Sequence, residues 1–416
     1  MTAGLTRQAL RGHPWSFFGP VTTLCLGAAI VSGALGAQAS FSGAQLDAAG
    51  RRALDASDAV EFATIFVLLA IYLSIIVVGL TMTSTIARQA RDIALVRAVG
   101  ATPGRVRRAV ATQAAVVAMP AVLLGVPLGA LAGRAWIQGL AGHGVVPAAV
   151  TFRPSAAAWP VALTIAVGAA VVGALVAAVR PARVRPAVAL AETTVPRRTF
   201  GRVRTGLGIV LVVSGVVLSA SIANLSADQA DDLGFFVVLA MCIGAGLLGP
   251  ALLRVTVPVV RLLGDTGTLA ADNVAVRAKA LSGALVPLVL AVGFATIKVT
   301  AHTTAAHVTG VPDPAADVWL DYSGTAVYVT FAAVAALNTL VTFMLSRRGE
   351  IAATQLAGAT RARVLGLVTC EALIVTCTAL LAAASVAAAT LLPLVHTALG
   401  AWVPYLPPSF LRLPSS

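Results

Sequence analysis

Residues 88–106 read RQARDIALVRAVGATPGRV, and residues 346–364 read SRRGEIAATQLAGATRARV. At an offset of 258 residues, seven of these nineteen positions are identical, and an acidic residue, Asp92 or Glu350, stands at the same place in each copy. Internal similarity of this kind indicates an architecture built from related units. The sequence therefore predicts two related halves, residues 1–200 and 262–416, joined by a linking helix pair at 201–261.

Long apolar runs surround the two copies. The 416 residues are 58% hydrophobic and 11% charged, whereas soluble domains are about 25% charged. A helix needs about 20 mostly apolar residues to cross a bilayer. Nine runs meet this requirement, at 17–37, 60–86, 109–133, 156–179, 206–223, 234–257, 282–300, 323–345 and 364–392. The predicted fold is therefore an all-α polytopic membrane helix bundle of about nine transmembrane helices.

The basic residues lie between the apolar runs and predict an orientation. With the N-terminus inside, 23 of the 29 Lys and Arg residues fall in cytoplasmic segments, as the positive-inside rule requires. The net charge of +13 is explained by this topology and does not indicate nucleic-acid binding. Contact with anionic lipid of the inner leaflet is compatible with the same pattern. We expect a multi-pass protein of the cell membrane with a cytoplasmic N-terminus.

Each repeated segment is predicted to form a sharp corner between two helices. In the first copy, Ile93, Val96 and Val99 recur at helical spacing. Gly100 then ends that helix, because glycine readily takes the left-handed conformation after a helix C-terminus. Thr102 is a suitable N-cap for a new helix that continues into the membrane.

The second copy repeats the same signals, with Gly358 as the stop and Thr360 as the cap. A rigid corner on the cytoplasmic side is suited to receive a push from a partner. The plainer interpretation is a pair of well-capped loops that carry positive-inside arginines. Repetition of the glycine, the threonine and the acid favours partner binding. The predicted partner-binding residues are Arg91, Asp92, Ile93, Leu95, Arg97, Gly100, Ala101, Thr102, Glu350, Ile351, Gly358, Ala359 and Thr360.

The same residues carry a resemblance to a known family. The segment RDIALVRAVGATPGRVRR, the apolar helix after it and the segment VRPARVRPAVAL at 179–190 resemble the FtsX-like (MacB-type) ABC transporter permease family. Within the second segment the matching residues are Arg183, Pro186, Ala189 and Leu190. The second half is similar through Glu350, Ile351, Gly358, Ala359, Thr360 and Glu371. The resemblance implies two four-helix permease units that work with a separate ABC ATPase, which would dock on the elbows.

Two features depart from the family pattern. The outer loops, at about 38–59 and 301–322, are too short for a folded extracytoplasmic domain. The second half also reaches Ser416 before a fourth helix and a closing Arg-Pro segment. We therefore expect a second permease unit that lacks its last helix.

The expected function is that of a permease subunit. It would couple ATP hydrolysis by a separate ATPase to export, extraction or mechanical signalling involving an amphiphilic substrate such as a peptide, lipid or lipoprotein. A second permease chain and membrane lipid are further possible partners. The alternative is a non-transporting or degenerate membrane regulator that binds an ABC ATPase. An ion-coupled secondary transporter has less support, because such proteins place ionisable or broken-helix sites at the midplane.

Other motifs that carry chemistry are missing from the sequence. It contains no GxxxxGK[ST] segment, so ATP would be bound by a separate subunit, and we expect no cofactor and no enzyme activity in this chain. His302 and His307 lie near Asp313, but histidines in such a loop more often do not bind metal, and we expect no metal site. The four cysteines lie inside apolar runs and predict no disulfide.

Few ionisable residues fall inside the predicted spans. Glu371 lies near the inner part of the last span, whereas Lys298 and Arg134 lie near outer ends, where long side chains can reach water. An ionisable group in a membrane span indicates function by default. However, Gln113 occupies the position equivalent to Glu371, which argues against a proton relay shared by the two halves.

Overall fold

The computed structural model describes residues 18–55, 57, 59–68, 71, 75, 95–183, 201–222, 227–261, 264–399 and 405. Every regular element in these ranges is a helix, which confirms the predicted all-α class. Seven helices are long and apolar enough to cross a bilayer, and one bent pair is an eighth candidate. These candidates coincide with eight of the nine predicted runs. The run at 60–86 lies largely outside the described residues and contributes the short apolar helix Ala59–Leu68.

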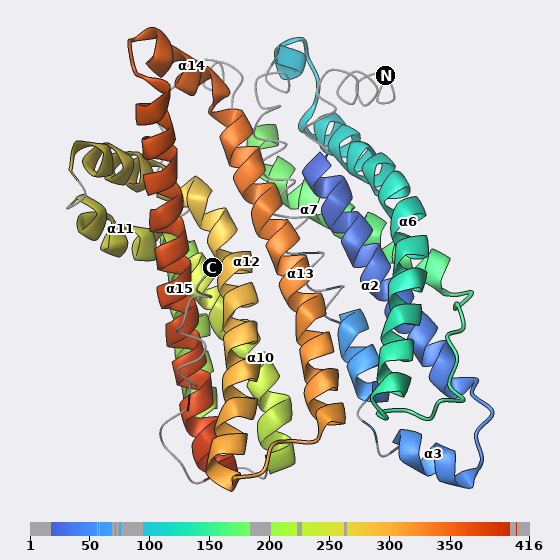
Figure 1. The fold of residues 1–416 in the computed structure, drawn as a ribbon. Helices are drawn as coiled ribbons and strands as arrows, with labels where there is room; N and C mark the ends of the chain where they lie inside the picture. Colours follow the sequence, from blue (N-terminus) through green and yellow to red (C-terminus); the bar gives the residue numbers. More distant parts are fainter. Residues whose placement is uncertain are drawn as a thin grey trace. The chain divides into compact units, whose positions relative to one another are not determined.

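The chain divides into two compact units. The first unit comprises Met1–Pro196 and Ala315–Gly324, and the second comprises Arg197–Pro314 and Thr325–Ser416. The helices of the first unit are α2 (Phe18–Ser42), α3 (Ala48–Asp55), α6 (Pro103–Gly142), α7 (Ala158–Arg183) and the first ten residues of α13 (Ala315–Ser346). Those of the second are the rest of α13 with α9 (Gly201–Ile222), α10 (Ala227–Leu247), α11 (Gly249–Val260), α12 (Asp265–Thr309), α14 (Arg348–Leu356) and α15 (Arg361–Leu399) (Figure 1).

In the first unit, glycines allow α6 to pack closely against α2. Gly125, Gly129 and Gly133 recur every four residues along α6. A Cβ atom on Gly133 would lie 3.0 Å from the Cα atom of Gly33 on α2. Lipid tails are as apolar as leucine, so helices in a membrane associate through such close backbone packing and through hydrogen bonds between helices. The Ser32 hydroxyl adds one such bond by donating to the Val126 carbonyl at 2.9 Å.

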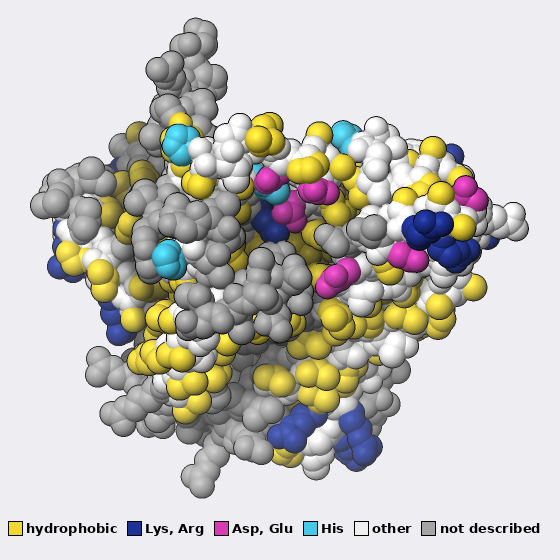
Figure 2. Space-filling model, turned by 90° about the horizontal axis from the view of Figure 1, so that it is seen from below, with side chains coloured by type: hydrophobic (Ala, Val, Ile, Leu, Met, Phe, Trp, Pro, Cys, Tyr) yellow, Lys and Arg dark blue, Asp and Glu magenta, His cyan; other side chains and the backbone are white. Residues whose placement is uncertain are grey.

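The first unit has an aromatic cluster at the end of α6 that lies farthest from Pro103. The Trp136 ring centroid lies 5.3 Å from that of Phe66, and the Trp136 indole N–H donates to the Ser323 hydroxyl at 3.0 Å. The short helix α3 adds Leu54 to the same buried cluster. Viewed from the end at which α3 lies, acidic, basic and histidine side chains are exposed among hydrophobic ones (Figure 2).

In the second unit, α15 packs along α12, and α10 packs on α9 and α12 (Figure 1). The predicted apolar run at 234–257 forms two helices, α10 and α11, which meet at an angle of 63°. Pro250 has no N–H to donate to the Gly246 carbonyl, so the helix ladder is interrupted. Arg204 on α9 donates to the freed carbonyls of Gly246 and Leu247, each at 3.1 Å. A charged side chain of the neighbouring helix α9 thus supplies the hydrogen bonds that the last carbonyl groups of α10 lack.

The connection between α12 and α13 is shorter than the sequence suggested. We expected an outer loop at about 301–322, but α12 runs to Thr309 and α13 begins at Ala315. The turn residue Gly310 has a φ of +69° and ends α12 in the left-handed conformation. The reversal therefore needs only residues 310–314, and helix occupies the rest of the expected loop.

Candidate functional site: two helix elbows

The first elbow, residues 95–106, joins a short helical segment to α6. Gly100 has a φ of +104°, which confirms the predicted left-handed stop. Its N–H donates to the Arg97 carbonyl at 3.0 Å, and the N–H of Ala101 donates to the Val96 carbonyl at 3.2 Å. This pair of bonds is a Schellman motif, which satisfies carbonyls left open at a helix C-terminus. The corner is therefore held by its own backbone.

The second elbow, residues 353–364, joins α14 to α15 with the same bonds at an offset of 258 residues. Gly358 has a φ of +96°. Its N–H donates to the Gln355 carbonyl at 3.0 Å, and the N–H of Ala359 donates to the Thr354 carbonyl at 3.2 Å. The prediction that one helix break occurs twice in the chain is confirmed at the level of individual hydrogen bonds.

Both predicted N-caps are present. The Thr102 hydroxyl accepts a bond from the N–H of Arg105 at 3.4 Å, and the Thr360 hydroxyl accepts one from the N–H of Arg363 at 3.3 Å. Such caps satisfy one of the donors that a helix N-terminus leaves open. Pro103 follows the first cap at the first helical position, where its missing N–H has no cost. Each long helix therefore begins at a fixed residue next to its elbow.

A large hydrophobic side chain is exposed at each corner. Val99 is 92% exposed and Leu356 is 90% exposed, which are the highest values among large hydrophobic residues in the described ranges. A single exposed hydrophobic residue is ordinary on a protein surface. Here, however, one lies within two residues of the left-handed glycine in both elbows, and each elbow also has an exposed arginine, Arg105 or Arg361. An apolar tip with a basic rim is a surface that a protein partner can cover.

The predicted site residues are described to different extents. Arg91, Asp92 and Ile93 lie outside the described residues, and only the backbone of Glu350 is described, as part of α14. Leu95 is about half exposed, whereas Arg97 and Ile351 are partly buried. The glycine, alanine and threonine of each copy form the corner itself. Their binding role remains a prediction.

The segment that contains the first elbow is similar to a known family. Residues 64–186 match the family model described as FtsX-like permease C-terminal, and this segment contains the first elbow, α6 and α7. Over this segment, which is less than a third of the chain, the sequence is similar to FtsX-like permeases. No curated protein matches the chain. Its described apolar helices, seven of which are long enough to cross a bilayer, make the chain a multi-pass membrane protein.

Beneath the second elbow, outside the matched FtsX-like segment, a buried ion pair joins three parts of the unit. Arg347 lies at the corner between α13 and α14 and donates from both terminal nitrogens to the two carboxylate oxygens of Glu371 on α15. Asn273 on α12 donates to the same carboxylate at 3.0 Å. Arg347 is 5% exposed and Glu371 is 2% exposed. Bidentate arginine–carboxylate pairs are strong and directional, so this pair fixes the start of α14 to α15.

The equivalent place in the first half of the chain has different side chains. Gln113 on α6 corresponds to Glu371 and is 7% exposed. Its amide nitrogen has no hydrogen-bond partner among the described residues. The residue that corresponds to Arg347 is Gln89, which lies outside the described residues. The ion pair of the second half thus stands where the first half has two neutral amides.

Sequence reasoning singled out Glu371 but not its partners. Arg347 counted as one more positive-inside residue, and Asn273 gave no signal because it precedes the apolar run at 282–300. The sequence did contain one signal for this pair. The positions of Arg347 and Glu371 are both glutamine in the first half, so an acid and a base replace two neutral residues together. In the sequence Arg204 is one more basic residue between two apolar runs, although it binds the end of α10.

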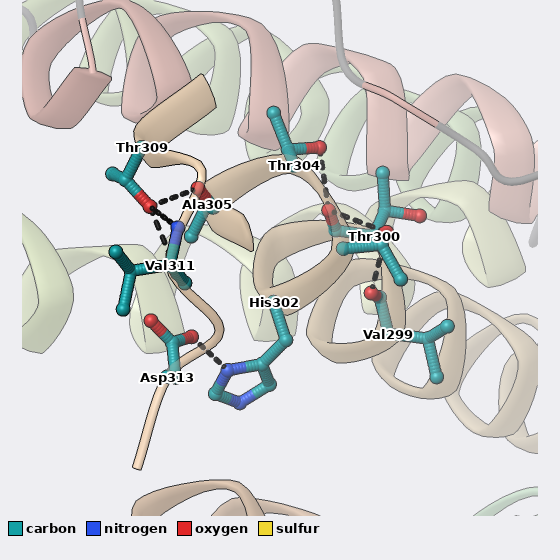
Figure 3. Close-up of polar contacts among 9 residues, drawn as sticks. Val299, Thr300, His302, Thr304, Ala305, Thr309, Val311 and Asp313 are labelled. Atoms are coloured by element: carbon teal, nitrogen blue, oxygen red, sulfur yellow. Dashed lines mark hydrogen bonds and ion pairs between the residues drawn. The ribbon is translucent and has the colours of Figure 1, made fainter. Parts of the chain in front are cut away.

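The histidines considered for metal binding lie at the end of α12. The His302 ring points to Asp313 in the connection to α13, with 2.6 Å between Nδ1 and the carboxylate oxygen (Figure 3). His307 instead stacks on the ring of Tyr405, with the centroids 3.8 Å apart. Within the described residues no group of three or more His, Cys, Asp or Glu side chains could hold a metal ion. The His302–Asp313 contact ties the connection to α12.

Proposed function

We propose that the chain is the permease subunit of an ABC transport complex and that its two elbows receive a separate ATPase. The observation that carries this proposal is the repeated corner, with the same hydrogen bonds, the same caps and an exposed apolar side chain at the tip in both copies. Two matched sites suit an ATPase that acts as a pair of similar subunits. ATP would be bound by that partner and not by this chain.

The elbows are positioned to pass movement across the membrane. α6 has 40 residues and α15 has 39, so each extends about 60 Å at 1.5 Å per residue. A bilayer core is about 30 Å thick. A push on either corner would therefore tilt or shift one continuous helix that reaches the opposite surface. We propose a cell-membrane location with the N-terminus and both elbows in the cytoplasm, in agreement with the distribution of arginines.

The proposed cargo or target is an amphiphile handled at the membrane surface. The family resemblance supports this class, and the exposed leucines along α6 would place such a molecule beside lipid-facing helices. A regulator that binds the ATPase without moving a substrate would use the same elbows. The two functions differ in whether ATP-dependent movement of a substrate accompanies partner binding.

The test is co-purification of an ATPase with the tagged full-length chain, followed by measurement of ATP hydrolysis. The double variant Val99→Asp/Leu356→Asp places a charge at both tips without removing a buried contact. We expect its affinity for the ATPase to fall at least tenfold, because buried anchor residues dominate interface energy. Reporter groups at Thr102→Cys and Thr360→Cys should both react from the cytoplasmic side.

The matched control is Val311→Asp, an equally simple change at an exposed valine in the connection between α12 and α13. It should leave ATPase binding unchanged. If the double variant binds the ATPase as tightly as the wild type, the elbows are not the docking site. Binding without ATP-dependent movement of a labelled lipid or lipopeptide in vesicles would instead identify the regulator.

A further inference from the structure

A groove in the first unit runs along the part of α6 distant from the elbow. Its volume is about 840 Å³, within the usual range for ligand pockets. One wall is α6, and the other is the segment 148–154 that precedes α7. Its lining residues include Pro127, Leu131, Arg134, Gln138, Thr151 and Phe152.

The α6 wall is one continuous helix face. Pro127, Leu131, Arg134, Gln138 and Ala141 are spaced by three or four residues, so their side chains project in one direction. At 1.5 Å per residue this face is about 21 Å long. The part from Pro127 to Arg134 is about 10 Å long, so it can hold the part of an acyl chain nearest the headgroup while the rest of the chain stays in the bilayer.

The second wall is held in place by contacts with the helices. The Phe152 ring occupies a notch between glycines, since a Cβ atom on Gly133 would lie 2.7 Å from it. The backbone N–H of Arg153 donates to the Ser40 hydroxyl on α2 at 2.7 Å. The groove is therefore preformed, and a ligand would not have to order its wall.

The groove opens toward the surface that faces lipid. Leu131 lines it and is 66% exposed, and Leu128 on the preceding turn is also exposed. In a membrane protein, exposed leucines on a spanning helix contact the acyl chains of the bilayer. A molecule of the surrounding leaflet could therefore enter from the side, without passing through water.

The polar chemistry of the groove selects the headgroup. Arg134 is exposed and makes no hydrogen bond or ion pair with another described residue. Gln138 lies one turn further along the same face, and none of the described residues that line the groove is a carboxylate. A permanent cation beside an amide donor attracts an anion and repels a metal ion. The apolar surface from Pro127 to Leu131 is then left for a hydrocarbon tail.

We propose that this groove binds one phospholipid with an anionic headgroup, with the phosphate at Arg134 and Gln138 and one acyl chain along Pro127 and Leu131. This site is independent of the proposed transport function, because it needs neither an ATPase nor ATP. The competing explanation is that Arg134 merely extends to water at the membrane surface. In that case the chain would not distinguish anionic from zwitterionic lipid at this position.

The test is native mass spectrometry of the full-length chain released from bilayer discs of equal parts phosphatidylglycerol and phosphatidylcholine. We expect one retained phosphatidylglycerol, with a preference over phosphatidylcholine of about tenfold, as expected for a hydrogen bond to a charged group. Arg134→Gln should abolish the preference and Arg134→Lys should keep most of it. Arg153→Gln, which removes a neighbouring charge that does not line the groove, should change nothing.

A second variant tests the tail. Ala130→Trp fills the apolar part of the groove and leaves Arg134 in place, so it should lower retention of the lipid while the protein stays monodisperse with a normal unfolding temperature. The proposal is wrong if Arg134→Gln keeps the preference or if Ala130→Trp retains the lipid. It is also wrong if millimolar inorganic phosphate displaces the lipid, since the groove would then hold a free anion.

Discussion

The two elbows close with the same five hydrogen bonds, yet the helices below them are held differently. In the second half, Arg347 and Glu371 form a buried ion pair that Asn273 completes. In the first half, Gln113 is buried at the place of Glu371 without a charge. The backbone corner depends only on a glycine and a threonine, whereas the packing below it can be satisfied by more than one set of side chains.

This difference indicates that the corner is the element the two halves share. A bidentate ion pair is more directional than a contact between neutral amides, because both charged groups must face each other. The second elbow is therefore expected to be the stiffer of the two. If the proposed ATPase binds both elbows, unequal stiffness would let one movement of that partner act differently on α6 and α15. Three sets of variants can break or sharpen this comparison.

The largest effect is expected at the ion pair. Glu371→Gln or Arg347→Gln alone leaves a buried charge without its partner, which costs about 3–5 kcal/mol of stability. The double variant Arg347→Gln/Glu371→Gln copies the residues of the first half and removes both charges. It should unfold at a higher temperature than either single variant when thermal unfolding is followed in detergent. If the double variant is less stable than both single variants, the second half cannot accommodate the two glutamines that the first half has at these positions.

The left-handed glycines come next. Gly100→Val and Gly358→Val should each cost about 1–3 kcal/mol, because a β-branched residue is strained at positive φ. A Cβ atom at either position would meet nothing within 4 Å, so the cost is that of the backbone alone. The controls are Gly104→Ala and Gly366→Ala, in open space inside α6 and α15, which should be neutral or slightly stabilising. Equal losses at the two elbows support one shared corner, and a loss at only one contradicts it.

The smallest effect is expected at the N-caps. Thr102→Ala and Thr360→Ala should each cost about 1 kcal/mol, because a backbone donor loses its acceptor. Serine at either position should retain most of the stability. Thr112→Ala is the matched control, since its hydroxyl donates only to the Arg108 carbonyl of its own helix. If the control lowers the unfolding temperature as much as the two cap variants do, the threonines do not stabilise the elbows as N-caps.

Local signals predicted the corners well because their geometry is local. Gly100 and Gly358 take the left-handed conformation, and Thr102 and Thr360 cap the next helix, all through bonds between residues at most five positions apart. The apolar runs also predicted the spanning helices, because a bilayer imposes both a length and a composition. Periodicity and capping are properties of a segment, so they can be read without its neighbours.

Contacts between distant segments were not predictable in this way. The bend between α10 and α11 could have been suspected from Gly249 and Pro250, but the long apolar composition concealed it. The role of Arg204 at that bend and the pairing of Arg347 with Glu371 needed the tertiary structure. A charged residue in a sequence must meet an opposite charge, a hydrogen-bond partner or water, but the sequence does not show which residue is that partner.

From its amino-acid sequence alone, this chain is predicted to be a helical membrane protein of two related halves with two capped corners, because hydropathy, glycine and threonine act within a few residues or within one bilayer thickness. Only the tertiary structure decided which buried polar groups meet, where α10 bends, and that α6 and the segment 148–154 enclose a groove beside Arg134. These features join residues far apart in the chain, and packing selects one set of partners among many that the sequence would allow.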